Sequence, residues 1–257
     1  MFETIHTHTI YTPPLDADSV VLDLGAYRGE FAKEMRARYG GTSYLVEANP
    51  VLAEALRVEG SFPVWHCAVG ATEGPSYCYI AHNDTGSSLL TLPLASVYTC
   101  VLHETVQVQA KTLESLLTEI RAPRIDLLKM DIEGAEVMVL RSLSGATLRA
   151  IGQITVKFCS DPVFGFDADE RRRDVEEVIR SLQRHGFLCV DFSGTSRLDV
   201  LFVNCALHRI PWLQRVLWEF WTPPPCWLSG LRQKLPPLWQ SRMRRTLDWA
   251  TGLRARS

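Results

Sequence analysis

The stretch IDLLKMDIEGAE, residues 125–136, decides the fold class of this chain. It begins as a near-continuous aliphatic run, which is typical of a strand covered on both faces of a parallel sheet, and it ends in charged residues. Burying charges without partners costs free energy. The lysine and the acids therefore need partners, either one another or a polar ligand at the end of the strand.

Two accounts of these charges stay open at the level of sequence. Alternation along a strand puts Lys129 and Asp131 on the same side, so they can form an ion pair while Glu133 caps the next helix. Alternatively, all three converge on a bound ligand and its reacting neighbour. We favour the ligand, because a buried ion pair by itself gains little over apolar replacements. Lys129, Asp131 and Glu133 are therefore the candidate catalytic residues.

Strand and helix signals alternate between about residues 19 and 206. SVVLDLG and TSYLVEANP read as strands, each followed by a segment with helical spacing, and SFPVWHCAVG reads as a third strand. FLCVDFS and LDVLFVNC are close enough in sequence to pair antiparallel. This pattern predicts an α/β domain with a mostly parallel, doubly wound sheet and a C-terminal antiparallel hairpin. Residues 1–18 form an N-terminal segment before it.

Ligands of open α/β sheets bind beyond the carboxyl ends of the strands. Asp23, Gly25 and Gly29 lie at the carboxyl end of the first strand. Glycine lets the backbone approach a ligand closely, although glycine also ends many strands for steric reasons alone. The Gly-x-x-x-Gly spacing differs from the dinucleotide-binding pattern, which disfavours an NAD-dependent enzyme, and an acid beside the loop suits a cationic ligand. Glu47 ends the second strand, where it can accept ribose hydroxyls or complement the dipole of the next helix.

The motifs VLDLGAYRGEFA, YLVEANP, CAVGATEG, TGSSLL and LLKMDIEGAE occur in the order found in FkbM-family methyltransferases, which the chain resembles over about residues 19–160. The resemblance implies a class I methyltransferase (Rossmann-like) fold that uses S-adenosylmethionine to methylate hydroxyl oxygens of sugars, glycans or polyketides. The cofactor-binding residues expected on this basis are Asp23, Gly25, Ala26, Tyr27, Gly29, Glu47, Ala48, Ala68, Ser87 and Asp131.

The chain departs from the family pattern in places. Tyr27 stands where the family usually has asparagine, and Lys157 and Cys159 stand where glutamate and histidine are common. The acceptor base is therefore left open among Asp131, Glu133, His82 and Asp84; we do not nominate His66. Carboxylates with clear metal-ligand spacing are missing from the sequence, so no metal is expected.

The region from residue 207 to the end differs in composition. It holds nine Lys or Arg, two Asp or Glu, and six of the seven tryptophans. PWLQRVLWEFW and PLWQSRMRRTLDWA each place apolar residues on one helical face. Such basic tails can lie in a membrane interface, or they can pack on the parent domain or on a second copy of the chain. The competing function is a non-catalytic adaptor with a methyltransferase fold, which docks through this tail.

The remaining properties favour a cytoplasmic protein, at most peripheral at the membrane. The net charge of −2 gives no reason to expect nucleic acid, and the seven cysteines show no CxxC or zinc spacing. The first residues lack a signal peptide pattern, and no apolar stretch approaches the roughly 18 residues of a spanning helix. The expected partner is a small-molecule or glycan acceptor.

Overall fold

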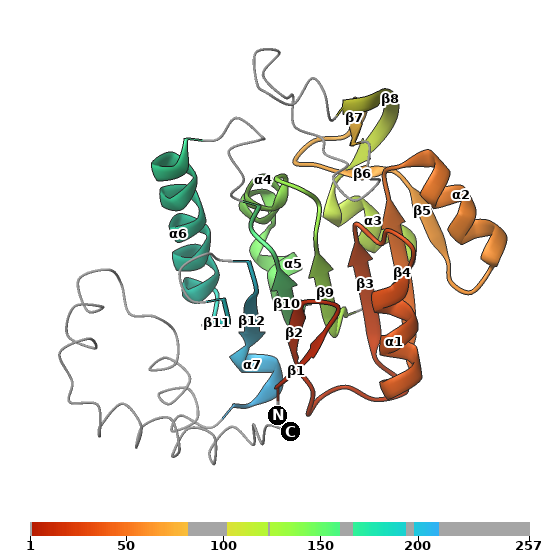
Figure 1. Ribbon diagram of the computed structural model, residues 1–257. Helices are drawn as coiled ribbons and strands as arrows, with labels where there is room; N and C mark the ends of the chain where they lie inside the picture. Colours follow the sequence, from red (N-terminus) through yellow and green to blue (C-terminus); the bar gives the residue numbers. More distant parts are fainter. Residues whose placement is uncertain (1, 82–101, 123, 160–166, 194–197, 211–257) are drawn as a thin grey trace, which may run out of the picture.

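The structure is a computed structural model and describes residues 2–81, 102–122, 124–159, 167–193 and 198–210 (Figure 1). The helices are α1 (Glu30–Tyr39), α2 (Pro50–Glu59), α3 (Leu113–Ile120), α4 (Glu136–Ser142), α5 (Gly145–Arg149), α6 (Ala168–Arg184) and α7 (Cys205–His208). The strands are β1 (Phe2–Ile5), β2 (His8–Tyr11), β3 (Val20–Leu24), β4 (Thr42–Glu47), β5 (Val64–His66), β6 (Ala68–Val69), β7 (Gly74–Ala81), β8 (Leu102–Lys111), β9 (Leu127–Met130), β10 (Gln153–Val156), β11 (Phe187–Asp191) and β12 (Val200–Asn204).

A seven-stranded sheet in the order β11-β12-β10-β9-β3-β4-β5 forms the centre of the molecule. Within this sheet β5, β4, β3, β9 and β10 pair in parallel with their neighbours, and β12 pairs antiparallel with both β10 and β11. The predicted mostly parallel sheet with a C-terminal antiparallel hairpin is therefore confirmed. The chain winds outward from β3 in one direction and then from β9 in the other, so a topological switch point lies between these two strands. Ligands bind at such points.

The two faces of the sheet bury different partners because side chains alternate along each strand. Leu22 and Leu128 belong to the largest core, which also takes residues from α3, α4, α5 and α6. Val21 and Leu127 point the other way, into a core with α1 and the N-terminal hairpin. Helices therefore cover both faces, as a doubly wound sheet requires.

The N-terminal segment folds as a hairpin of β1 and β2, which the sequence did not predict. Ile5 and Ile10 of this hairpin pack in the α1 core. The backbone N–H of Tyr11 donates to Gln153 Oε1 at 2.8 Å, and Gln153 Nε2 donates back to the Tyr11 carbonyl at 2.9 Å. The hairpin thus lies on the sheet face beside β10 and β12 (Figure 1).

Two predicted elements are divided in the structure. The third strand, SFPVWHCAVG, splits at Cys67: β5 stays in the central sheet, whereas β6 pairs with β8 in a second sheet of order β6-β8-β7. Two segments in which polar and apolar residues alternate form the antiparallel pair β7–β8 of that sheet. The segment AEVMVLRSLSG has helical spacing and ends in glycine, but α4 ends before Gly145, which begins α5, because Ser144 Oγ accepts a hydrogen bond from the Thr147 N–H and caps a new helix.

Within the part of the chain that the structure describes, no helix combines the length and apolar character needed to cross a membrane. Most of the tail predicted from residue 207 lies outside the described residues. Its first residues are described, and Ile210 is buried against β12 and β11.

Candidate active site

A cavity of about 410 Å³ opens at the carboxyl ends of the central strands. Its volume lies in the range of small-molecule sites. Most of the residues predicted to bind the cofactor or act in catalysis line it: Gly25, Ala26, Tyr27, Glu47, Ala48, Ala68, Lys129, Asp131 and Glu133. Asp23 and Gly29 do not line the cavity. Ser87 and the candidate bases His82 and Asp84 lie outside the described residues.

The loop after β3 packs directly on the end of β9. Gly25 has a φ of +77°, and a Cβ added there would lie 1.9 Å from the carbonyl oxygen of Asp131. The N–H groups of Gly25 and Ala26 both donate to the Val46 carbonyl, at 3.0 and 3.1 Å. Only glycine fits this contact, so the glycine loop brings the first strand and the Asp131 segment to one wall of the cavity.

Glu47 ends β4 with a buried carboxylate that two backbone groups hold in place. Its Oε2 accepts from the Tyr27 N–H and its Oε1 from the Asn49 N–H, each at 2.8 Å. Burial raises the pKa of this carboxyl, and the two hydrogen bonds act against that rise. Each carboxylate oxygen can accept further hydrogen bonds, so Glu47 is oriented to receive hydroxyl groups of a ligand.

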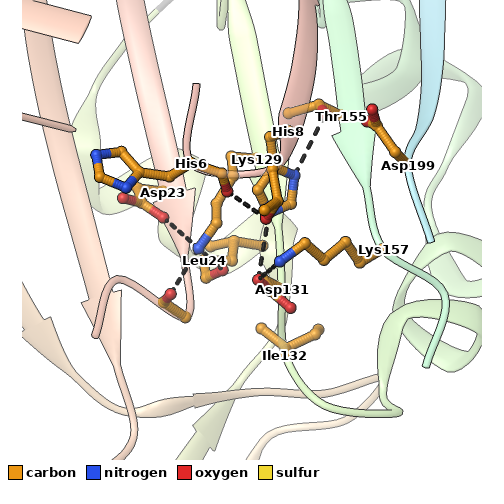
Figure 2. A network of polar contacts seen from close by, with 12 residues as sticks. His6, His8, Asp23, Leu24, Lys129, Asp131, Ile132, Thr155, Lys157 and Asp199 are labelled. Atoms are coloured by element: carbon orange, nitrogen blue, oxygen red, sulfur yellow. Dashed lines mark hydrogen bonds and ion pairs between the residues drawn. The ribbon is translucent and has the colours of Figure 1, made fainter. Parts of the chain in front are cut away.

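Lys129 pairs with Asp23 rather than with Asp131. The register of β3 and β9 sets these two residues side by side, and Lys129 Nζ lies 2.9 Å from Asp23 Oδ1 and donates to the Gly25 carbonyl at 2.6 Å (Figure 2). Burial opposes the charge on Lys129, but the carboxylates of Asp23 and Asp131 outweigh it and raise the pKa of the lysine. The pair considered from the sequence, Lys129 with Asp131, is therefore wrong, and Asp23 lies behind Lys129 without lining the cavity.

Asp131 receives two other donors. His8 Nε2 lies 3.2 Å and Lys157 Nζ lies 2.9 Å from the same oxygen, Oδ2 (Figure 2). Burial works to raise the pKa of Asp131, but the His8 hydrogen bond and the charges of Lys129 and Lys157 hold it well below its usual range. Asp131 therefore stays ionised, which suits it to orient a cationic group and makes it a weak base.

The pKa of Glu133 is shifted in the opposite direction to that of Asp131. Burial, followed by the negative charges of Asp131 and Glu136, raises its pKa to about 7. The turn that presents it is held by Glu136, whose buried Oε1 accepts from the Gly134 N–H at 3.0 Å and whose Oε2 lies 3.1 Å from an Arg171 nitrogen of α6. The carboxylate that organises the start of α4 is thus Glu136, and Glu133 is presented to the cavity.

Several cavity residues were not nominated from the sequence. His6 and His8 come from the hairpin, Phe31 from α1, and Leu198 from the segment before β12. The alternation in IHTHTI resembles a single strand, but the stretch crosses the turn of the hairpin, so His6 lies in the turn and His8 begins β2. Lys157 was noted only as a departure from the family pattern, yet it lies in the cavity and contacts Asp131.

The family model described as the methyltransferase FkbM domain matches residues 23–189. The chain belongs to this family. The FkbM match begins near the end of β3, covers β4 to β10, and ends in β11. A search of curated proteins gives no match to the chain.

Solved structures similar to this FkbM-family chain share little sequence with it. One is precorrin-6y C5,15-methyltransferase from Geobacter metallireducens, 13% identical over 74% of this chain and 81% of that chain, with a TM-score of 0.38. Another is fibrillarin from Aeropyrum pernix with natively bound S-adenosylmethionine, 16% identical over 75% of this chain and 68% of that chain, with a TM-score of 0.40. Likenesses this remote carry no argument about substrate.

The residues of the cavity fit S-adenosylmethionine, the cofactor of this class I methyltransferase fold. The close contact at Gly25 sets the β3 loop and the Asp131 segment side by side at the cavity wall. Glu47 offers a carboxylate at the position that binds ribose hydroxyls in such folds, and the ionised Asp131 suits a cationic ligand. Among the described residues, no cluster of three His, Cys, Asp or Glu side chains could hold a metal ion. The chain is therefore an S-adenosylmethionine-dependent methyltransferase by family and by fold.

Proposed function

We propose that this enzyme transfers the methyl group of S-adenosylmethionine to a hydroxyl oxygen of a sugar, a glycan or a polyketide-type small molecule. The observation that supports oxygen as the acceptor is the pairing of two unlike acids in one cavity. Asp131 stays ionised, whereas the pKa of Glu133 is raised to about 7. A hydroxyl acceptor must lose a proton, and a base works best when its pKa lies near the operating pH.

The residues divide the work of an in-line displacement. The cofactor supplies an electrophilic methyl group on a sulfonium. Glu47 and the backbone of residues 25–27 hold the nucleoside, and Asp131 orients the cationic amino acid part. Glu133 would take the proton of the acceptor hydroxyl as its oxygen bonds to the methyl carbon and the carbon–sulfur bond breaks, which leaves S-adenosylhomocysteine. Alignment of the reacting atoms at about 3 Å contributes most, and the base adds about 10²–10⁴-fold.

The first test is cofactor binding, followed by a search for the acceptor. S-adenosylhomocysteine is titrated into the protein by calorimetry, and the protein is then incubated with S-adenosylmethionine carrying a deuterated methyl group and with fractions of a cell extract. Mass spectrometry should find a product heavier by one labelled methyl, and fragmentation should place it on oxygen. A label on nitrogen or carbon contradicts the proposal.

The role of Glu133 gives a pH test on the acceptor so found. A base acts in its deprotonated form, so the rate should rise as pH increases through about 7 and level off above it. Glu133→Gln should lower turnover by about 10²-fold or more, remove this rise and leave S-adenosylhomocysteine affinity unchanged. Full turnover in Glu133→Gln excludes it as the base.

A second candidate is the non-catalytic adaptor. The observation that favours it is Lys157, which contacts the Asp131 carboxylate from inside the cavity. An adaptor would bind S-adenosylhomocysteine but methylate no acceptor, and Lys157→Met would not change this.

The basic tail is proposed to contact either a membrane surface or a second copy of the chain. Sedimentation with anionic liposomes and size-exclusion chromatography separate these cases when the full chain is compared with a chain ending at Ile210. That end point keeps the buried Ile210 side chain.

A further inference from the structure

The N-terminal hairpin brings a buried histidine to the cavity from outside the family-matched region. His8 is 1% exposed and lies in β2, whereas the FkbM match begins at residue 23. Its ring packs edge-on against Phe31 of α1 at a centroid distance of 5.8 Å. The polar groups that face it are Thr155 on β10, Lys129 and Asp131 at β9, and Lys157 after β10.

The partners of His8 fix its tautomer. A carboxylate can only accept hydrogen bonds, so Nε2 carries the proton and donates a hydrogen bond to Asp131 Oδ2. Nδ1 is then the acceptor for the Thr155 hydroxyl, at 3.3 Å. Burial is the main cause that lowers the pKa of His8, to about 4. The ring is therefore neutral at physiological pH and serves as a fixed donor.

This arrangement leaves the two oxygens of Asp131 unequal. Oδ2 receives both His8 Nε2 and Lys157 Nζ, whereas Oδ1 accepts no hydrogen bond within the described ranges of the chain. The backbone N–H of Asp131 donates to the Leu24 carbonyl at 3.1 Å, which holds the backbone of Asp131 but does not set its side-chain rotamer. The two donors on Oδ2 set its rotamer and leave Oδ1 available to a ligand in the cavity.

The hairpin that carries His8 is anchored independently of Asp131. The Thr9 N–H donates to Asp199 Oδ1 at 2.8 Å, and Thr9 Oγ1 donates to Asp199 Oδ2 at 2.5 Å. On the other side of His8, the turn at His6 and Thr7 has φ values of 43° and 68°, and His6 Nε2 lies 3.1 Å from Glu34 of α1. His8 is therefore held rigidly against the cavity wall.

We propose that His8 is a positioning residue for methyl transfer, which holds Asp131 so that Oδ1 receives the cationic amino group of the cofactor's amino acid part. This inference rests on the proposed function, because it requires S-adenosylmethionine in the cavity. It makes the N-terminal hairpin a functional part of the active site.

The test uses variants of His8 that keep one or the other of its two hydrogen bonds, to Thr155 or to Asp131. The amide of His8→Asn reaches only the level of Nδ1, so it keeps the Thr155 contact and loses the Asp131 contact. The amide of His8→Gln reaches the level of Nε2 and can still donate to Asp131. Thr9→Val is the matched control, because it removes the Thr9 Oγ1 hydrogen bond beside His8 but keeps the backbone N–H to Asp199 Oδ1, which holds the hairpin in place.

Calorimetric titrations compare S-adenosylhomocysteine with 5′-methylthioadenosine, which lacks the amino acid part. His8→Asn should weaken S-adenosylhomocysteine binding about tenfold, as expected for coupled members of one hydrogen-bond network, and should leave methylthioadenosine binding unchanged. His8→Gln should restore most of the loss, and Thr9→Val should match the wild type. If His8→Asn weakens both ligands equally, or neither, the positioning role is overturned. If the wild type binds neither ligand, the proposed function itself fails, and that outcome is distinct.

A spectroscopic measurement checks the charge state directly. Imidazole nitrogen NMR of the full chain should show His8 as the neutral Nε2–H tautomer from about pH 8 to about pH 5, whereas an ordinary histidine titrates in that interval. An Nδ1–H tautomer, in which Nε2 carries no proton to donate to Asp131, overturns the inference even if the binding data agree.

Discussion

Replacing Gly25 by alanine tests whether the β3 loop and the Asp131 segment form one site. The added Cβ would lie 1.9 Å from the Asp131 carbonyl oxygen, whereas contacts under 3.0 Å essentially do not occur. The two backbones must therefore separate by at least 1.1 Å, the difference between these distances. A displacement of about 1 Å in a site can reduce function by about 10²-fold.

The same substitution also carries a conformational cost that a control must isolate. Gly25 has a φ of +77°, and the left-handed region costs an ordinary residue about 1–2 kcal/mol. Gly60, which ends α2, has a φ of +69°, but the nearest atom to its added Cβ is 3.9 Å away. Gly60→Ala therefore has the conformational cost of a positive φ, but its added Cβ has no steric clash.

The assay combines urea unfolding with calorimetric titration of S-adenosylhomocysteine. Gly60→Ala should lose about 1–2 kcal/mol of unfolding free energy and keep its affinity. Gly25→Ala should lose at least as much stability and bind S-adenosylhomocysteine more than tenfold more weakly. If Gly25→Ala folds and binds the ligand as the wild type does, the contact of the glycine loop with Asp131 does not shape the cofactor site.

Three further changes test individual contacts. Glu47→Gln should weaken S-adenosylhomocysteine binding by about tenfold or more by calorimetry, since the amide loses the charge that strengthens hydrogen bonds to ribose hydroxyls; unchanged affinity would exclude the ribose role. Lys129→Met leaves the Asp23 carboxylate buried without its partner and should reduce the unfolding free energy by about 3–5 kcal/mol in urea, whereas Asp23→Asn combined with Lys129→Met should recover part of that loss. Arg171→Met should reduce the unfolding free energy in urea more at pH 8 than at pH 6, because burial raises the pKa of Glu136 to about 7 and the ionised carboxylate then lacks a counter-charge. The folded state opposes ionisation of Glu136, so the unfolding free energy falls as pH rises through that pKa. An equal loss at both pH values would refute this coupling.

The sequence by itself determined the elements and much of the cofactor side of the site. Pro50 begins α2 and Gly60 ends it in the left-handed region, positions where proline and glycine are typical, and Thr112 caps α3 by accepting from the Ser115 N–H. Alternation and local spacing report these features because helix ends and strand faces depend on neighbouring residues. The motifs of the family also placed Glu47 at a strand end in the cavity.

Only the tertiary structure decided which charges meet. Alternation put Lys129 on the side of Asp131, but it could not show that the register of β3 sets Asp23 next to Lys129. His8 contacts Asp131 across 123 positions of sequence, and Lys157 reaches the same carboxylate from the residue directly after β10. Periodicity tells which face a side chain takes, whereas the neighbour across that face depends on strand order, and strand order is a property of the whole chain. The division of roles between an ionised Asp131 and a Glu133 with a raised pKa follows from those neighbours.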